Sequence, residues 1–312
     1  MSEINKAKYV DIPAQVAQDG DNDWRQGMYP SARMHYSRAA QLYNEKEDYQ
    51  GEAQVLNRMA EMELSLDEYE QAEKLLENSL EVVKDLTDAE STHIETLILQ
   101  SKVYTAQYKL EKALSTIKQA EKEFHTSGGI LLGDCYDQEA YIHLVMGNEA
   151  KALDAYDRAA HIFAEEHTGL KEASALRSMA RIEMKFQNYE RAHDLLEKCR
   201  ELYRENGDLL GEASSLSAIG CLRYIIRDIE KARKALMKAV YLYGKVSHHF
   251  AEAEALLYLA RVESYNKEEG DFERAKSHYK KSIELYDFLQ NETMKNAVVE
   301  EYDNFLKREM MK

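Results

Sequence analysis

Proline is almost missing from this 312-residue chain, which contains only Pro13 and Pro30. Proline breaks helices because it lacks the backbone N–H and its ring clashes with the preceding turn. Its absence from the rest of the chain, together with abundant Ala, Leu, Glu and Lys, predicts an almost entirely helical protein. Residue types other than proline must therefore separate the helices.

Cysteine and long apolar runs are also scarce. The three cysteines, Cys135, Cys199 and Cys221, form no CxxC pair, and their odd number excludes a complete intramolecular disulfide framework. A reducing compartment is the simpler interpretation. No run approaches the roughly 20 apolar residues that a membrane span requires, and the first 19 residues contain no apolar signal-peptide core. We therefore expect a cytoplasmic protein with no direct membrane insertion.

Positive charge is in deficit, with 57 acidic against 41 basic residues and a net charge of −16. This balance argues against binding of nucleic acid or anionic membranes in general, because both need a positive field. It is compatible with a partner that is basic, or locally basic, and it says little about the fold.

Catalytic and metal-binding motifs are missing as well. No HExxH, P-loop or GxGxxG sequence occurs. The adjacent histidines His248 and His249 would point about 100° apart on a helix, so they do not form the two-histidine face of a zinc site. We therefore expect a protein that is not an enzyme and that binds no metal or cofactor.

What the chain does have is an alanine at intervals of about 40 residues, a period typical of stacked helical units. Most of these alanines have a small residue twelve positions upstream, another small or short residue seven positions downstream, and a large apolar residue eleven positions downstream. The marker alanines are Ala32, Ala72, Ala113, Ala152, Ala192, Ala232 and Ala275. The upstream small residues are Ala60, Ser101, Ala140, Ala180, Gly220 and Ala260, the last of them fifteen positions before its alanine.

Each period has room for two helices of about 15 residues and two short turns. Apolar residues fall at i, i+3 and i+4 spacing, as at Leu176, Met179 and Ala180, so each helix has one buried stripe. The small residues let the two helices of a pair approach closely. The large apolar residue near the end of the second helix is well placed to fill the gap against the next pair.

This pattern resembles the tetratricopeptide repeat family, in which a large apolar residue, a small residue, an alanine and a further small residue follow at fixed spacing. The first unit, around Trp24 to Tyr43, is expected to keep only its second half. The other units read Leu56–Ala60–Ala72–Ser79, Leu97–Ser101–Ala113–Ala120, Tyr136–Ala140–Ala152–Ala159, Leu176–Ala180–Ala192–Cys199, Leu216–Gly220–Ala232–Ala239 and Leu256–Ala260–Ala275–Ser282.

The period is longer than the roughly 34 residues usual in that family. In this it is similar to the arrays of spindle-orientation adaptors, kinesin light chains and bacterial peptide-pheromone receptors. The resemblance implies an all-α fold, a right-handed α-solenoid of about seven helical hairpins. We assign residues 1–13 to an N-terminal tail, 14–287 to the solenoid and 288–312 to a C-terminal capping helix.

The capping helix is predicted from an apolar stripe near the C-terminus. The stripe has helical spacing and consists of Met294, Val298, Tyr302, Phe305 and Leu306. A solenoid otherwise exposes its last apolar face, so we expect this helix to cover that face. The alternative is a helix that binds a partner.

In the family, the first helix of each unit lines a concave groove, so the resemblance implies that residues beside the upstream small residue point into it. The candidate groove residues are Asn57, Lys102, Tyr141, Arg177, Arg181, Lys185, Tyr224, Arg261 and Tyr265. Arginine and tyrosine carry much of the binding energy at interfaces. The basic members predict a partner with an acidic or carboxylate-bearing segment. The alternative is that they are ordinary exposed charges.

These features predict a non-enzymatic scaffold or adaptor that binds a peptide, or a helical segment of another protein, in the groove. Two alternatives remain open at this point. One is a regulator that senses a short peptide, and the other is an accessory subunit of an enzyme or of a vesicle-fusion complex.

Overall fold

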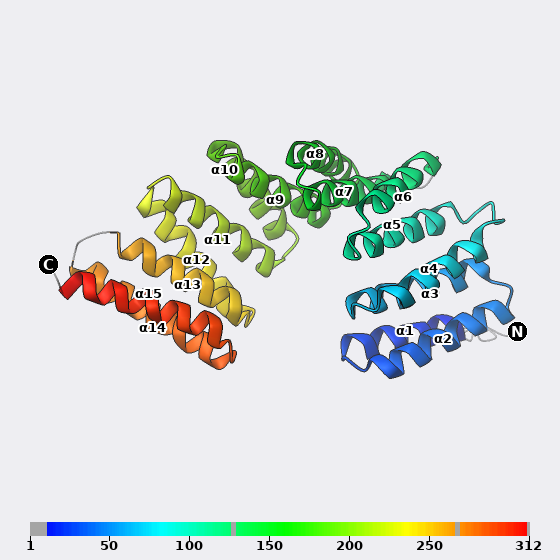
Figure 1. Cartoon of the computed structure of the whole chain (residues 1–312), viewed down its shortest axis with the longest axis horizontal. Helices are drawn as coiled ribbons and strands as arrows, with labels where there is room; N and C mark the ends of the chain where they lie inside the picture. The colour runs from blue at the N-terminus through cyan, green and yellow to red at the C-terminus, as the bar shows by residue number, and fades with distance from the viewer. Residues whose placement is uncertain (1–10, 126–128, 266–268, 311–312) are drawn as a thin grey trace, which may run out of the picture. The chain divides into compact units, whose positions relative to one another are not determined.

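Fifteen helices and no strand occur in the part of the chain that the computed structural model describes, residues 11–125, 129–265 and 269–310 (Figure 1). The predicted all-α fold is confirmed, with seven successive helix pairs followed by a last helix. The helices are α1 (Ile12–Arg25), α2 (Tyr29–Glu45), α3 (Tyr49–Ser65), α4 (Tyr69–Val83), α5 (Glu90–Ala106), α6 (Leu110–Glu123), α7 (Gly129–Val145), α8 (Glu149–Glu165), α9 (Gly169–Lys185), α10 (Tyr189–Glu205), α11 (Leu209–Ile225), α12 (Ile229–Lys245), α13 (His249–Glu263), α14 (Glu269–Phe288) and α15 (Glu292–Met310).

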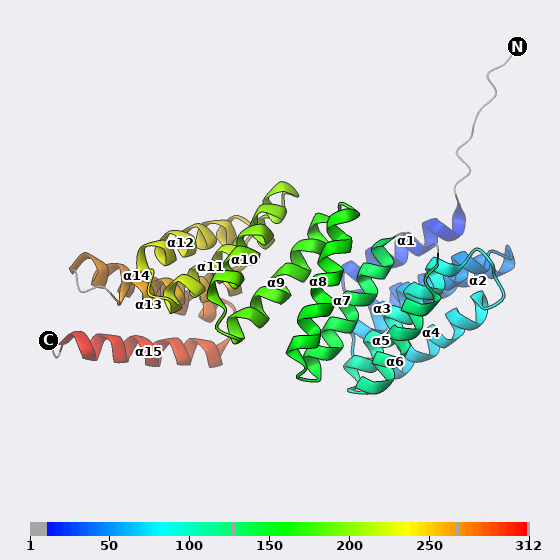
Figure 2. The same cartoon turned by 90° about the horizontal axis from the view of Figure 1, so that it is seen from above.

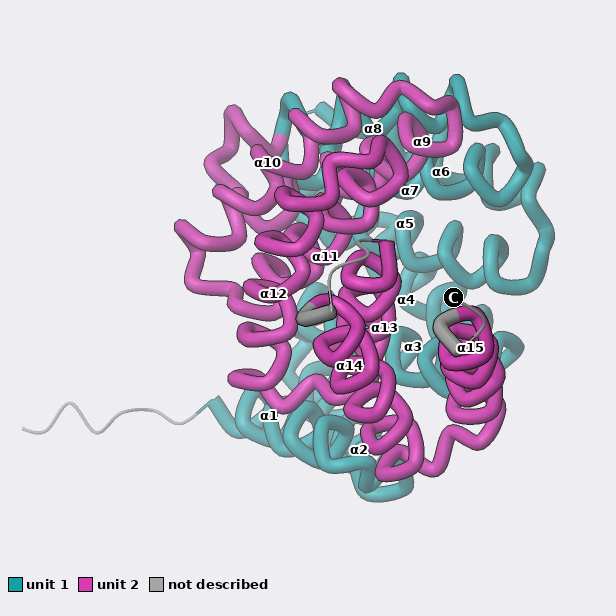
Figure 3. Tube along the Cα trace, turned by 90° about the vertical axis from the view of Figure 1, so that its left-hand side faces the viewer, with its two compact units in different colours: residues 1–162 teal, residues 163–312 magenta. Residues whose placement is uncertain are grey.

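The chain divides into two compact units, residues 1–162 and 163–312, with the boundary inside α8 (Figure 3). Within each unit, consecutive helix pairs lie side by side (Figure 2). We call the first helix of each pair its A helix and the second its B helix. Residues 1–10 of the predicted N-terminal tail lie outside the described residues.

Close helix packing at the marker alanines holds each pair together. All seven marker alanines are completely buried. In the α11–α12 pair the upstream small residue is Gly220, and a Cβ added there would lie 2.6 Å from Cγ of Leu236. A larger side chain at these positions would therefore force the two helices apart.

The first pair is complete, so the expectation that the first unit keeps only its second half is wrong. Helix α1 packs against α2 through the buried Ala17 and Gly20. Gly20 lies at the same distance before Ala32 as Ala60 lies before Ala72. A Cβ at Gly20 would come within 2.8 Å of the Tyr36 ring, so glycine takes the place of the upstream small residue.

Consecutive pairs are joined by contacts at the downstream positions. The rings of Tyr43 and Tyr203 fill the space beside Gly51 and Gly211, at the start of the next A helix, as the sequence pattern predicts. Within a pair, the downstream small residue of the B helix also donates a hydrogen bond to a backbone carbonyl of its own A helix. These bonds run from Ser79 to Ala53 (3.3 Å), from Cys199 to Ala173 (3.2 Å) and from Ser282 to Ala253 (2.9 Å).

Arginine–glutamate pairs also tie a B helix to the next A helix. Arg33 follows a marker alanine and donates two hydrogen bonds of 2.6 Å to Glu63, thirty residues later. Arg233 binds Glu263 in the same way, at 2.9 and 3.0 Å. Both carboxylates are buried. A buried carboxylate is tolerated because such two-pronged pairing offsets the loss of water.

Most of the described turns between helices share one backbone feature, a residue with positive φ just before the next helix. Glycine takes this position at Gly27, Gly147 and Gly207, whereas other turns place a non-glycine residue there, such as Gln187 with φ of 62°. The conformation closes the helix end, because the N–H of Asp208 reaches the carbonyl of Tyr203 at 2.9 Å.

The positive φ at these turns predicts how exchanging glycine and non-glycine residues there changes the stability of the protein. Gln187→Gly should raise the thermal unfolding midpoint, followed by circular dichroism, by about 1–4 °C, because glycine avoids the steric cost of positive φ. Gly207→Ala should lower it, since the φ of 70° disfavours alanine although nothing lies within 4 Å of the added Cβ. A shift of both variants in the same direction would contradict this backbone explanation.

Candidate functional site

The exposed side of the A helices carries most of the predicted groove residues, and we call it the A-helix face. One repeated position on this face is the residue directly after the upstream small residue. It is occupied by Lys102 and Tyr141 in unit 1 and by Arg181 and Arg261 in unit 2. Side chains from neighbouring A helices meet around this position, and a pocket forms at three places.

The pocket in unit 1 has a volume of about 260 Å³ and lies between α3, α5 and α7. The predicted groove residues Lys102 and Tyr141 both line it. Leu64 and Val145 supply apolar walls, and Tyr108 lies at its edge on the turn after α5. This pocket therefore combines one cation with largely apolar surroundings.

Asn57 lies inside unit 1 and not on the A-helix face, which corrects its predicted position. Its side chain is only 5% exposed. The amide donates to the hydroxyl of Thr96 on α5 at 2.9 Å, and that hydroxyl also lies 3.2 Å from Ser79. The amide is therefore satisfied by neighbouring helices within the packed interior.

A second pocket, of about 350 Å³, lies beside two arginines on α9 in unit 2. Arg177 and Arg181 line it together with Ser178, and Met184, Leu196 and Ala218 complete its largely apolar wall. Both arginines are exposed, as is Lys185 one turn further along the helix. Within the described parts of the chain, neither Arg177 nor Arg181 is ion-paired with a carboxylate. We call this site the arginine pocket.

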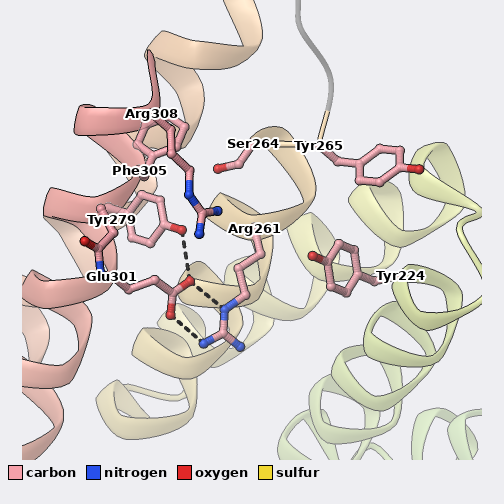
Figure 4. Close-up of a pocket in the computed structure, with 9 residues that line it drawn as sticks. Tyr224, Arg261, Ser264, Tyr265, Tyr279, Glu301, Phe305 and Arg308 are labelled. Atoms are coloured by element: carbon pink, nitrogen blue, oxygen red, sulfur yellow. Dashed lines mark hydrogen bonds and ion pairs between the residues drawn. The ribbon is translucent and has the colours of Figure 1, made fainter. Parts of the chain in front are cut away.

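The third pocket is also in unit 2, with a volume of about 430 Å³. It brings together the predicted groove residues Tyr224, Arg261 and Tyr265. The remaining lining residues are Ser264, Tyr279, Glu301, Asn304, Phe305 and Arg308 (Figure 4). The helices α11, α13, α14 and α15 contribute to it, so we call it the α15 pocket.

Arg261 is bound by a carboxylate of this same chain. Its Nε and one terminal nitrogen donate to the two oxygens of Glu301 on α15, at 2.8 and 2.7 Å, and the Tyr279 hydroxyl donates to Glu301 at 3.0 Å (Figure 4). The hydrogen bonds from Arg261 lower the pKa of Glu301, and they raise the pKa of Arg261 in turn. Arg261 is thus neutralised beside α15 and does not add an uncompensated charge to the arginine pocket.

The sequence reasoning missed Glu301, although a signal for it was present. Glu301 lies 40 residues after Arg261, one repeat period later, so α15 stands where the next A helix would follow. Its apolar stripe packs on the last pair, with Val298 and Phe305 buried against Tyr279 and Tyr286. We propose that this helix caps unit 2.

Removing the charge of Glu301 should destabilise the folded protein at neutral pH. The lowered pKa means that the pair stabilises the fold above the ordinary carboxyl pKa, near 4.5, and that this contribution is lost as the pH falls through the lowered value. Because the pair is partly exposed, Glu301→Gln should cost about 1 kcal/mol of unfolding free energy at neutral pH.

Urea unfolding of both proteins from neutral pH down to about pH 3 measures this difference in free energy, which should shrink as the pH falls below 4.5. The exposed neighbour Glu300 offers the control, since Glu300→Gln should change little at any pH in this range. An equal loss in both variants would show that Arg261 contributes nothing specific.

The described residues offer no sign of a metal site or of a membrane helix. No group of three or more His, Cys, Asp and Glu side chains there is arranged to hold a metal ion. None of the described helices has both the length and the apolar composition needed to cross a membrane.

The chain is similar to known proteins in a part of its sequence and in its fold. The sequence model of the tetratricopeptide repeat family matches residues 20–85. A sequence search of curated proteins finds no match. The matched segment begins inside α1 and ends just beyond α4, so it covers the first two helix pairs of the repeat described above.

Solved structures of similar architecture extend over most of the chain. The apo form of RapI is 18% identical, with 89% of this chain and 77% of that chain covered and a TM-score of 0.70. A signal transduction ATPase with a tetratricopeptide repeat sensor, from Pyrococcus horikoshii, is 15% identical over 92% of this chain and 44% of its own, with a TM-score of 0.72. The apo quorum sensor NprR from B. thuringiensis is 13% identical, covering 94% and 84%, with a TM-score of 0.60.

At such low identity these likenesses concern the fold alone. The fold nevertheless agrees with the family match and with the helix pairs that repeat around the marker alanines. Residues 20–85 thus match the tetratricopeptide repeat family, and the helix pairs of the rest of the described chain have a similar fold.

Proposed function

We propose that this protein is a recognition scaffold that binds an acidic segment of another protein, or a carboxylate-bearing peptide, at the arginine pocket. The observation that carries this proposal is the absence of an ion pair at Arg177 and Arg181 within the described residues. Elsewhere in the same acidic chain, Arg33, Arg233 and Arg261 are each held by a glutamate in a two-pronged geometry.

The chemistry of the pocket supports a ligand with acidic and apolar parts. A guanidinium group holds a carboxylate through two parallel hydrogen bonds, and Arg177 and Arg181 lie one helical turn apart, so they can act on one acidic segment. Met184 and Leu196 offer apolar contact beside them. Because the α9 surface is already ordered by helix packing, little ordering cost falls on the protein.

Recognition rather than catalysis is the activity that we propose, in agreement with what is said of two proteins of similar fold. One is described as a quorum sensor and another as carrying a tetratricopeptide repeat sensor. A peptide-sensing regulator and an accessory subunit would both use such a surface. They differ in the event that binding triggers, which depends on the partner.

The proposal predicts that reversing the two charges abolishes partner binding without unfolding the protein. We would compare the wild type with Arg177→Glu/Arg181→Glu as baits for quantitative affinity capture from the native source. Both side chains are exposed, so helicity and melting temperature should stay close to the wild-type values. Raising the salt concentration should weaken capture by the wild type, because exposed charges are screened.

A matched control is Arg204→Glu/Lys234→Glu, which changes two exposed basic residues of α10 and α12 and so shifts the net charge equally. A protein retained by the wild type and by the control, but lost by the first variant, would then be tested as synthetic segments with and without their acidic residues. Equal capture by both variants would place the partner elsewhere on the chain.

A further inference from the structure

The α15 pocket shares no lining residue with the arginine pocket and has a different chemistry. Side chains from α13 and α15 face each other across it, and Tyr224 reaches it from α11 (Figure 4). All of these helices belong to unit 2. Its volume of about 430 Å³ is enough for a small molecule or for the last residues of a peptide.

The pocket contains two arginines and one glutamate and so carries one positive charge in excess, although Arg308 also helps to lower the pKa of Glu301. The charges of Arg261 and Glu301 cancel, because both carboxylate oxygens accept hydrogen bonds from Arg261 and the Tyr279 hydroxyl binds there as well. Arg308 also lines the pocket and is exposed, and no carboxylate of the described residues forms an ion pair with it. Figure 4 shows its guanidinium group reaching inward from α15.

Aromatic rings line the opposite side of the pocket. Tyr224 and Tyr265 lie there, away from Arg308 (Figure 4). The guanidinium carbon of Arg227 lies 5.0 Å from the centre of the Tyr265 ring. One face of that ring therefore already interacts with a cation, and the added positive charge disfavours a cationic ligand.

Polar groups near Arg308 favour a carboxylate as the charged part of a ligand. The amide of Asn304 lines the pocket one helical turn before Arg308 and can donate a hydrogen bond. The Ser264 hydroxyl already donates to the carbonyl of Ala260 at 2.6 Å, so it offers a ligand only its lone pairs. Arg308 and Asn304 are thus the donors on the α15 side.

We propose that the α15 pocket binds a carboxylate attached to an aromatic group, with the acid held by Arg308 and the ring placed against Tyr224 and Tyr265. Two sources share this chemistry, a small aromatic acid and the free C-terminus of a peptide that ends in an aromatic residue. Stacking on the tyrosines adds to the charge-assisted hydrogen bonds. A ligand that joins Arg308 on α15 to Tyr224 on α11 and to Tyr265 just after α13 also stabilises the attachment of α15, since it binds only the folded arrangement.

The test uses three probes with the whole protein: 3-phenylpropionate, the peptide N-acetyl-Gly-Gly-Phe with a free carboxylate, and the same peptide as its C-terminal amide. Isothermal titration calorimetry measures their affinity, and thermal unfolding measures the shift of the midpoint. We expect binding of at least one acid with a raised midpoint and no binding of the amide. Binding of the acid peptide alone identifies the peptide source, and binding of 3-phenylpropionate alone identifies the small acid.

Two variants of the same helix separate specific from general charge effects. Arg308→Gln should weaken binding about tenfold or more, because it removes the group that holds the acid. Lys307→Gln removes the same charge from the adjacent exposed residue and should leave the affinity unchanged. Tyr265→Ala should weaken binding of the aromatic acids.

Three results would overturn the proposal. The first is that neither acid binds at millimolar concentration to the wild type. The second is that Arg308→Gln and Lys307→Gln weaken binding equally. The third is that the amide binds as tightly as the free acid. Circular dichroism of each variant establishes that a loss of binding does not come from unfolding.

Discussion

The close approach of two helices at a buried alanine is the contact on which the other features of this chain depend. At each marker alanine a side chain of one carbon allows the helix backbones to come together, and Gly220 and Gly20 show the same demand for space on the partner helix. Because the packing is this dense, the two helices of a pair have little freedom to slide or rotate against each other. The same sequence position therefore reaches the same place in successive helix pairs of a unit.

This regular placement explains why pockets form at equivalent positions while their chemistry differs. The residue after the upstream small residue is Glu61, Lys102 or Tyr141 in unit 1, and Arg181, Cys221 or Arg261 in unit 2. The backbone supplies the site, and the side chains decide what it can hold. A repeat array can change its ligand by a few substitutions on the A-helix face where these positions are exposed, as at Lys102, Tyr141 and Arg181.

The distribution of carboxylates decides which arginines are available to a ligand. Glu63, Glu263 and Glu301 each hold an arginine from a neighbouring helix, so these ion pairs serve the fold. Within the described residues, Arg177 and Arg181 of the arginine pocket and Arg308 form no ion pair with a carboxylate. An acidic chain can in this way present local positive charge, and the surrounding negative charge disfavours anions that lack a matching shape.

The sequence by itself determined the helical class, the period, the helix pairs and the aromatic residues that fill the gaps between pairs. These features follow from local steric limits and from the spacing of residues along the chain, and both can be read from one sequence. It also singled out Lys102, Tyr141, Arg177 and Arg181, which line pockets in the structure, and their part in binding a partner stays a prediction. The missing half of the first pair was an error of interpretation, since Gly20 meets the same steric rule as the other small residues.

Only the tertiary structure decided which of the predicted side chains are buried and which are bound by an ion pair. Asn57 is buried because Thr96, on another helix, satisfies its amide. Arg261 is neutralised because α15 brings Glu301 within 2.8 Å of it. Such outcomes depend on distances between residues about 40 positions apart, which the packing of neighbouring helices sets and which the periodic pattern alone does not specify.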